Sequence, residues 1–354
     1  MQSFIYEALP ARVVFGSGTV AQIRAEAQRL GVRRVLVLSK PGRGEAQAHA
    51  VAGLLGELGV GIHAGAVMHT PVTATEMALE VVRELQADAV VAVGGGSTTG
   101  LGKAIALRTD LPQIVLPTTY AGSEMTPILG ETKDGVKTTQ RTRKVLPGVV
   151  IYDVDLTMGL PPAIAATSGM NAMAHAVEAL YAKDRNPVIS LMAEEGIRSL
   201  AWALPGIVED PQGRRARADA LYGAWLCGTC LGSVGMALHH KLCHVLGGIF
   251  DLPHAETHTV VLPHAVAYNA SAAPDAMERI AQAIGADDAA QGLFALTERL
   301  GVKRALRDIG MPAEGIERVV RLTMAAPYWN PRPLDEEALR ALLTRAWNGE
   351  PPQA

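Results

Sequence analysis

The stretch DAVVAVGGGSTTGLGKAIA, residues 88–106, decides the fold. Five apolar residues, 89–93, lead into the triple glycine 94–96, and a helical pattern follows Ser97. A continuous apolar run is typical of a parallel strand buried on both faces. Glycines let a backbone approach a diphosphate closely, and a helix N-terminus offers free N–H groups to it. The spacing is not G-x-G-x-x-G, so a tight strand-to-helix turn without a ligand stays an alternative interpretation.

The same alternation of strand and helix extends over the first part of the chain. Strand patterns occupy residues 11–16, 33–39, 61–67 and 112–119, and helical patterns occupy residues 19–31, 46–59 and 73–86. Strands joined through helices imply crossover connections and a parallel sheet. We therefore predict an α/β dinucleotide-binding domain over residues 1–155. Ala- and Leu-rich helical patterns dominate afterwards, which predicts an all-α domain over residues 156–354, with the active site in the cleft between the two domains.

Composition narrows the classes of partner. The chain has 354 residues, a net charge of −3 and 4% aromatic residues, which argues against nucleic acid as a partner. A run of about 18 apolar residues is absent from the sequence, so we expect no membrane span. Three cysteines cannot form a disulfide framework, and with no secretory signal pattern they favour the cytoplasm. Cys227 and Cys230 lie in an apolar stretch, where we expect buried thiols rather than a redox pair.

A second polar loop, PTTYAGSE at residues 117–124, follows the next strand. Ligands of open parallel sheets gather at the carboxyl ends of the strands, so the two loops together predict a nicotinamide dinucleotide site. Ser39 ends another strand and carries no charge that would repel a ribose phosphate, which predicts that NADH and NADPH both bind. Lys103 could approach the cofactor or be a surface charge. The expected cofactor contacts are Ser39, Gly94, Gly95, Gly96, Ser97, Thr118, Thr119 and Lys144.

Histidines gather in the second domain. Seven of the ten lie between residues 175 and 264. His240 and His244 are four residues apart and share one helix face, as do Asn171 and His175 on another helix. His254 returns on a loop after Gly247–Gly248. Imidazoles on two helices and a loop can converge on one ion or substrate. His239, His258 and His264 stay open between core packing and a role in the site.

These motifs resemble the iron-containing (group III) alcohol dehydrogenase superfamily over nearly the whole chain. The resemblance is carried by GGGS at 94–97, PTTYAGSE at 117–124, GMNAMAHAVEA at 169–179 and H-x-x-x-H-x-L-G-G-x-F-D-x-P-H at 240–254. It implies a nucleotide-binding α/β domain followed by a helical domain. It also implies that the superfamily's metal-ligand positions are Asn171, His175, His240 and His254, and that His244 lies near the nicotinamide without binding metal.

Two departures from the superfamily pattern remove negative charge. The ligand aspartate is replaced by Asn171, whose neutral amide is a poor ligand for a divalent cation, and an aspartate of the glycine motif is replaced by Gly100. This combination resembles the branch of the superfamily that reduces maleylacetate, a dicarboxylate whose carbon–carbon double bond is conjugated to a ketone. That branch is not regarded as requiring a metal, so the resemblance implies NADH or NADPH as cofactor and no metal.

The resemblance implies hydride delivery to the alkene carbon beta to the ketone, followed by protonation of the enolate to 3-oxoadipate during the degradation of aromatic compounds. We expect His244 to be the proton donor or enolate stabiliser. Asn171 and Arg332 are expected to contact the dicarboxylate substrate, Arg332 as a two-oxygen clamp unless it is only a solvated loop charge. The remaining expected site residues are His175, His240 and His254, which would bind a substrate carboxylate or the enolate oxygen, with Tyr120 or Tyr328 assisting.

Three other functions remain open from the sequence. One is a metal-dependent alcohol or glycerol-type dehydrogenase of the same superfamily, with Asn171 as a weak ligand. Another is a lyase of the dehydroquinate synthase kind, which would show no net NADH oxidation. A nucleotide-binding regulator is a third, which histidines at i, i+4 on a cleft-facing helix disfavour. A homodimer is expected only from the resemblance.

Overall fold

The computed structural model describes residues 4–9 and 11–353. Two compact units divide the chain, Ala8–Leu160 and Pro161–Ala354, and residues 4–7 group with the second unit. The division falls five residues after the expected boundary at 155. The 3₁₀ turn Val154–Thr157 that follows the last strand stays with the first unit, where the Leu156 carbonyl accepts a hydrogen bond from Gln47 Nε2 at 3.1 Å.

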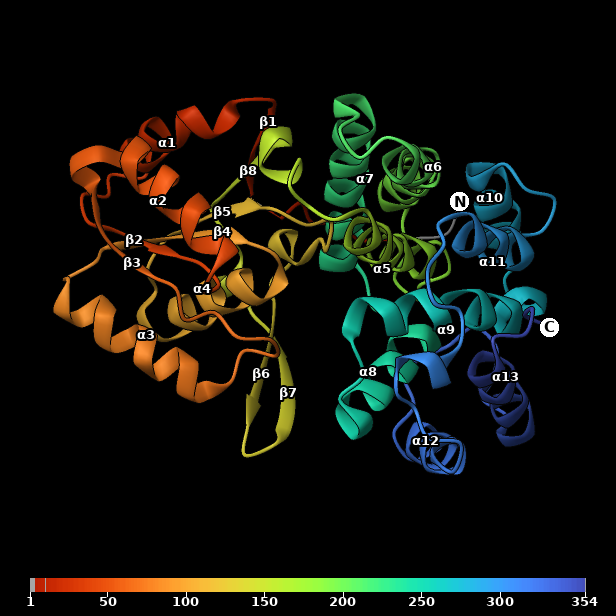
Figure 1. Ribbon diagram of the computed structural model, residues 1–354. Coiled ribbons are helices and arrows are strands. Elements are labelled where there is room, and N and C mark those ends of the chain that lie inside the picture. The colour runs from red at the N-terminus through yellow and green to blue at the C-terminus, as the bar shows by residue number, and fades with distance from the viewer. Residues whose placement is uncertain (1–3, 10, 354) are drawn as a thin grey trace. The chain divides into compact units, whose positions relative to one another are not determined.

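The first unit is built on a six-stranded parallel sheet in the order β1-β8-β5-β4-β2-β3 (Figure 1). The chain runs outward from β2 to β3, returns to β4 on the other side of β2, and continues outward from there. The order therefore reverses at β2 and β4, the place where open α/β sheets bind ligands. The strands are β1 (Arg12–Gly16), β2 (Val35–Leu38), β3 (Gly59–His63), β4 (Ala89–Gly94), β5 (Gln113–Pro117) and β8 (Val149–Asp153).

Both faces of the sheet are covered by helices, as the continuous apolar strands predicted. On β2, Val35 and Val37 pack with helices α1 and α2, and Leu36 and Leu38 pack with α3 and α4 on the opposite face. Alternate residues of one strand thus enter two different cores because side chains alternate across a sheet. The helices are α1 (Ile23–Arg29), α2 (Arg43–Leu55), α3 (Val72–Glu84) and α4 (Gly96–Thr109).

The segment Thr132–Lys144 lies mostly in a hairpin. Strands β6 (Ile128–Lys133) and β7 (Val136–Arg141) pair antiparallel as a separate two-stranded sheet. The turn between them is Asp134–Gly135, with φ of 51° and 76°. Two successive left-handed residues match the tight turns that hairpins favour, and Asp-Gly is a preferred pair there. The residue types at the turn, rather than a hydrophobic pattern in the strands, therefore favour this hairpin.

The second unit is helical throughout its described residues, which confirms the expected all-α architecture (Figure 1). Helix α5 has an unbroken run of buried residues from Ala165 to Leu180 and packs against α6, α7 and α9. Cys227 and Cys230 are buried free thiols inside α7, as expected. The helices are α5 (Pro162–Leu180), α6 (Pro187–Glu209), α7 (Arg214–Ser233), α8 (Leu238–Phe250), α9 (His254–Asn269), α10 (Pro274–Ile284), α11 (Ala289–Arg299), α12 (Gly315–Ala325) and α13 (Glu336–Asn348).

Membrane-spanning potential is low by length and composition. Over the described residues, none of the helices alone is long and apolar enough to cross a bilayer. Only α7 and α8 taken together pass that test, as a pair bent by 93°.

Candidate active site

The glycine turn between β4 and α4 forms a tight cradle at the carboxyl edge of the sheet. Gly94 has a φ of 157°, and a Cβ built there would lie 2.3 Å from Thr98 Oγ1. A Cβ on Gly95 would lie 2.9 Å from both Cγ2 and Oγ1 of Thr119. Gly96 is the exposed first residue of α4, so its N–H and its neighbours' have no preceding helical carbonyl. The turn fits the diphosphate of a dinucleotide, and it excludes larger residues.

The loop after β5 lies beside this cradle, as the sequence predicted. Gly94 pairs with Pro117 in the sheet, and the Thr118 N–H donates to the Gly94 carbonyl at 3.1 Å. Thr118, Thr119 and Ser97 are half-buried. The two loops together therefore present several hydroxyl groups at one strand edge.

Two residues of this unit that were expected in the site, Ser39 at the cofactor and Tyr120 at the substrate, are fully buried. Ser39 follows β2 at the same sheet edge, but it is 0% exposed and its Oγ has no hydrogen-bond partner among the described residues. Its hydroxyl cannot touch a ribose in this conformation. Tyr120 is also 0% exposed and packs in the interior of the loop.

Lys103 is buried inside the first unit, which rules out the surface interpretation. Its side chain extends from α4, and Nζ donates to the carbonyls of Ser123, Thr126 and Ile128 and to Thr126 Oγ1 at 2.5–2.9 Å. Burial lowers the pKa of Lys103 to about 7, partly offset by the nearby Glu124 carboxylate. Lys103 therefore anchors the segment that follows the β5 loop, and it acts on a cofactor only through that loop.

Lys144 does not reach the glycine cradle. Its Nζ lies 2.8 Å from a carboxylate oxygen of Asp110, the C-cap residue of α4, and its side chain is exposed. The cradle is at the other end of the same 14-residue helix, and such a helix is about 20 Å long. The structure therefore places Lys144 away from the glycine turn, where a cofactor contact was expected.

In the helical unit, three elements bring the predicted histidines together. Asn171 and His175 lie one turn apart on α5, and each is 4% exposed. The His175 ring centroid is 5.2 Å from that of His240 on α8, and His240 is 6.2 Å from His244. His254 begins α9 and is exposed. Its ring centroid lies 4.3 Å from that of His258 on the same helix. Imidazoles from two helices and from the first residue of a third, where a loop was expected, therefore lie together.

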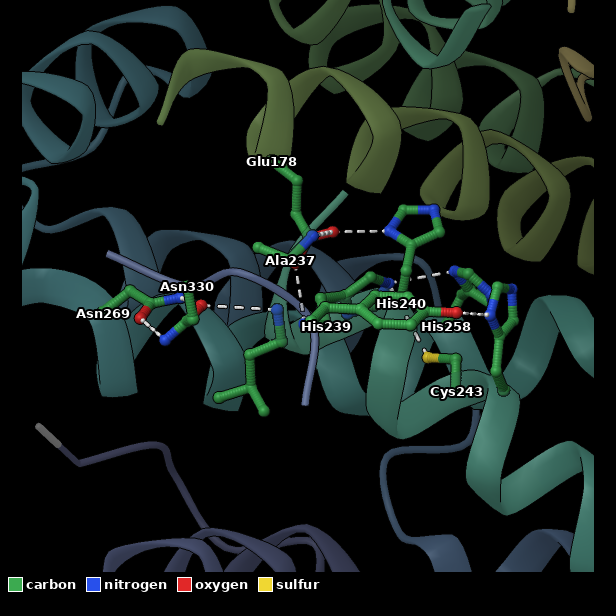
Figure 2. A network of polar contacts seen from close by, with 11 residues as sticks. Glu178, Ala237, His239, His240, Cys243, His258, Asn269 and Asn330 are labelled. Carbon is green, nitrogen blue, oxygen red and sulfur yellow. Dashed lines mark hydrogen bonds and ion pairs between the residues drawn. The ribbon is translucent and has the colours of Figure 1, made fainter. Parts of the chain in front are cut away.

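A buried carboxylate that the sequence interpretation missed organises this cluster. Glu178 Oε2 lies 2.7 Å from His240 Nδ1, as Figure 2 shows, and Glu178 is 0% exposed. The same carboxylate accepts hydrogen bonds from the N–H groups of Ala237 and His239 at 2.8 and 2.7 Å. It therefore caps the N-terminus of α8, where a negative charge is favoured, and it fixes the orientation of the His240 ring. Its position one turn after His175 is the signal that could have found it.

His244 is paired with a tyrosine from a distant segment. Its Nδ1 lies 3.0 Å from the Tyr328 hydroxyl, and Tyr328 is 39% exposed. Burial, with the Glu178 charge, raises the pKa of Tyr328, so the phenol keeps its proton near neutral pH. The pair is accessible and can exchange a proton with a bound molecule.

Tyr328 also lines a cavity of about 340 Å³, together with Asn330 and Arg332. The Arg332 guanidinium stacks over the Tyr268 ring at 4.4 Å and donates from Nη1 to the Tyr268 carbonyl at 2.9 Å. These contacts hold the guanidinium in one orientation beside the cavity. The structure thus places Arg332 with Tyr328, in the same unit as the histidines.

Burial favours the neutral form of three imidazoles, those of His175, His239 and His258. Burial lowers the pKa of His175 well below its usual value, and neighbouring imidazoles lower it further. The same causes act on the pKa values of His239 and His258. A neutral imidazole can donate or accept a hydrogen bond, so the cluster offers polar contacts without requiring protonation.

Comparison with known proteins identifies the family. The iron-containing alcohol dehydrogenase family model matches residues 10–154, and the model of the C-terminal part of the Fe-containing alcohol dehydrogenase family matches residues 165–347. The chain belongs to the iron-containing alcohol dehydrogenase family. This membership confirms the resemblance seen in the sequence, and it explains the order of an α/β unit followed by a helical one.

Several relatives within the family are maleylacetate reductases. The enzyme of that name from Rhizobium sp. (strain MTP-10005) is 56% identical, with all of both chains covered. Maleylacetate reductase 1 of Rhodococcus opacus is 51% identical over 99% of this chain and 98% of its own. The crystal structure of maleylacetate reductase from Agrobacterium tumefaciens has a TM-score of 0.96 and 56% identity over 99% of this chain and 100% of its own. These relatives do not favour the alcohol dehydrogenase or lyase alternatives.

The residues at the family's metal position do not fit iron. His240 is oriented by Glu178, and its Nε2, like His175 Nδ1, is buried without a partner among the described residues, so two ligand nitrogens are available. However, Asn171 contributes a neutral amide where iron sites of this kind need a carboxylate. In the part of the chain that the structure describes, the only three potential ligand atoms within 4.8 Å of one another belong to other residues. We therefore derive no step through a metal.

Proposed function

We propose that this chain uses NADH or NADPH to reduce the carbon–carbon double bond of maleylacetate, giving 3-oxoadipate, and that it needs no metal. Maleylacetate reductases that share half or more of its residues over the full length support the substrate. The observation that carries the absence of metal is Asn171, which is buried on α5 in the histidine cluster and carries no charge. A neutral amide suits a dianionic substrate better than a carboxylate does.

The cofactor would be held by the first unit. The Gly94–Gly96 cradle and the N-terminus of α4 suit the diphosphate, and the hydroxyls of Thr118 and Thr119 suit the nicotinamide ribose or amide. When bound, the reduced nicotinamide supplies the hydride. Ser39 is buried at the end of β2, and neither it nor the following Lys40 is a carboxylate that would repel a ribose phosphate, which supports use of both cofactors.

The substrate would be held by the helical unit. Reduction of the alkene carbon beta to the ketone leaves an enolate, whose charge is spread over oxygen and the alpha carbon. Hydrogen-bond donors can stabilise this charge without a metal. The imidazoles of His175 and His240 can donate such bonds. The Arg332 guanidinium, fixed by Tyr268, can engage a carboxylate of the substrate.

Protonation of the enolate at its alpha carbon completes the reaction. We assign this proton to His244, because its Nδ1 is hydrogen-bonded to the Tyr328 hydroxyl and the pair is accessible. A tyrosine that keeps its proton near neutral pH can hold the imidazole in the correct tautomer and orientation.

The sequence showed two losses of negative charge at the site, at positions 171 and 100, but the structure shows that one buried carboxylate, Glu178, remains. A carboxylate is present beside His240, but it accepts hydrogen bonds from two backbone N–H groups at the start of α8. The N-terminus of α8 therefore stabilises the negative charge of Glu178. The site retains one internal anion that positions a histidine, and it lacks the carboxylate at position 171 that would face a metal.

The test is the loss of NADH absorbance with maleylacetate, measured with and without a chelator. We expect turnover that yields 3-oxoadipate and is unchanged by the chelator. Activity lost with the chelator and restored by iron or zinc would overturn the metal-free proposal and favour an alcohol dehydrogenase. Absence of net NADH oxidation would overturn the reductase itself. Comparable rates with NADPH support the dual use of cofactors, and strict preference for one contradicts it.

The pathway, the cellular location and the oligomeric state of the enzyme are also proposals. We propose that the reaction serves the degradation of aromatic compounds, as the resemblance seen in the sequence implies. Three buried free thiols suit a reducing cytoplasm. Family resemblance supports a homodimer, which light scattering of the purified protein would test.

A further inference from the structure

A second set of potential metal ligands adjoins the histidine cluster, next to His240. His239 and Cys243 are one turn apart on α8, and His258 faces them from α9. Cys243 Sγ is 3.7 Å from His239 Nε2, which is 2.9 Å from His258 Nδ1. One potential ligand atom from each of the three residues lies within 4.8 Å of the other two. Figure 2 shows these three side chains turned toward one another. Each of these residues is at most 2% exposed.

The spacing is close to that of a small tetrahedral metal centre. Zinc binds imidazole nitrogen at about 2.0–2.1 Å and thiolate sulfur at about 2.3 Å, which places nitrogen and sulfur ligands roughly 3.6 Å apart and two nitrogens roughly 3.3 Å apart. The Sγ–Nε2 distance of 3.7 Å already matches. The two nitrogens, at 2.9 Å, would have to separate by only about 0.4 Å.

We propose that His239, Cys243 and His258 form a binding site for a thiolate-preferring cation, Zn²⁺ or Cu⁺. Two imidazoles and a thiolate select these ions over Mg²⁺, Ca²⁺ or Fe²⁺, which prefer oxygen ligands or a carboxylate. On four-coordinate Zn²⁺, the three protein ligands leave one position for a small molecule such as water. On Cu⁺, the same three ligands complete a trigonal coordination. The inference rests on this geometry and not on the proposed reductase function.

The state of the three side chains suits a cation. The metal-free pair shares one hydrogen bond between His239 and His258, and the outer nitrogens, His239 Nδ1 and His258 Nε2, are buried without a partner among the described residues. The Cys243 thiol holds its proton, since burial and the Glu178 charge raise its pKa. On binding, the S–H bond breaks, a metal–sulfur bond forms, and the proton passes to solvent.

Charge balance in the interior is also favourable. A thiolate with Zn²⁺ leaves a net charge of one, and the buried Glu178 carboxylate, which acts electrostatically on Cys243, offsets it. With Cu⁺ the thiolate neutralises the ion directly. The site is distinct from the family's iron position, which involves His175, His240 and His254 and has no sulfur ligand.

The test uses the full chain, stripped of metal by a chelator and given Co²⁺ as a spectroscopic probe. We expect one Co²⁺ per chain with a sulfur-to-cobalt charge-transfer band, which is lost in Cys243→Ser and in His258→Ala. Cys230→Ser is the matched control, because this thiol is also buried but lies near the Ile189 carbonyl rather than near a histidine. Separate titrations with Zn²⁺ and with Cu⁺ under reducing conditions identify which ion displaces cobalt.

Two results would overturn the proposal. One is cobalt that binds without the sulfur band and is released by His240→Ala, which would place it at the family's position. The other is no retained metal after gel filtration. X-ray absorption of the zinc-loaded wild-type protein needs no variant: a sulfur shell near 2.3 Å beside nitrogen near 2.0 Å is expected. A shell of nitrogen and oxygen alone contradicts the site even if the variants fail to fold.

Discussion

The Glu178 carboxylate and the His240 imidazole form a buried pair, with Oε2 and Nδ1 2.7 Å apart. The glutamate comes from α5 and the histidine from α8, so the pair joins the two helices that carry most of the cluster. Because Nδ1 is engaged, His240 presents Nε2 to its surroundings. One internal carboxylate thus determines both where α8 begins and which nitrogen of His240 can contact a substrate.

Replacing Glu178 with glutamine should weaken both stability and catalysis. The amide NH₂ cannot accept the backbone N–H bonds that both carboxylate oxygens now accept, which should cost about 1–3 kcal/mol of unfolding free energy. A misoriented His240 should lower kcat/KM by roughly 10- to 100-fold. Urea unfolding and the NADH assay measure the two effects. Glu57→Gln on the exposed surface is the control, and equal behaviour of the two variants would argue against the positioning role.

Asn171→Asp should restore an anion to the cluster. A carboxylate there should repel a dianionic substrate, so we expect KM for maleylacetate to rise by about tenfold or more, since a tenfold change corresponds to about 1.4 kcal/mol. The same change should increase the affinity of the cluster for divalent cations, because a hard carboxylate joins the imidazoles. Steady-state kinetics and iron retention after dialysis are the readouts. An unaltered KM would show that position 171 does not sense the substrate's charge.

His244→Ala should lower kcat by about 100-fold or more if this imidazole supplies the proton, the range typical of general acid catalysis. Tyr328→Phe keeps the histidine but removes its hydroxyl partner, so we expect a smaller loss. Single-turnover measurement separates this step from cofactor release. His49→Ala changes an exposed histidine of the first unit and serves as the control. An unchanged rate in His244→Ala would remove it from the mechanism.

Gly95→Ala should impair cofactor binding without unfolding the sheet. The added Cβ would lie 2.9 Å from two side-chain atoms of Thr119 and would push apart the loops after β4 and β5. We expect KM for NADH to rise at least about tenfold, a loss of about 1.4 kcal/mol. Gly53→Ala is the control, because a Cβ there meets nothing within 4 Å and alanine in a helix interior should stabilise by about 0.5–1 kcal/mol. Equal KM values for the two variants would contradict the cradle.

Lys103 should make stability depend on pH. Its pKa is lowered to about 7 in the folded chain from an ordinary value of 10.5. Between these values the unfolded chain binds more protons, so the contribution of Lys103 to stability increases as pH rises. Lys103→Met removes this dependence. From pH 7 to pH 9 the wild-type protein should gain roughly 2–3 kcal/mol relative to the variant in urea unfolding. Parallel stability curves for the two proteins would contradict the shifted pKa.

Much of the fold followed from the sequence because periodicity reports burial. The apolar run 89–93 became β4, and the glycines after it became the turn into α4. The hairpin at 128–141 was missed, since its strands are mostly polar and its pairing depends on the Asp134–Gly135 turn. A hydrophobic pattern cannot reveal a strand whose side chains pack against little of the hydrophobic core.

Predicting the site was harder because its contacts join distant segments. The i, i+4 spacing of His240 and His244 revealed a shared helix face, but it could not show that Tyr328 meets His244 across 84 positions. Lys144 was expected to contact the cofactor, and only the structure shows that it pairs with Asp110 at the opposite end of α4. Motif resemblance named the histidines, and only the packing of α5 against α8 revealed Glu178 as their partner.

The three thiols, Cys227, Cys230 and Cys243, all lie in the helical unit, and all are buried and free. An alkylating reagent should therefore react with this protein only when α7 or α8 opens. Because the α/β unit carries none, the alkylation rate should report transient opening of the helical half alone, with no engineered label. Cofactor and substrate analogues could then be ranked by how far each slows the reaction, even under conditions where no turnover occurs.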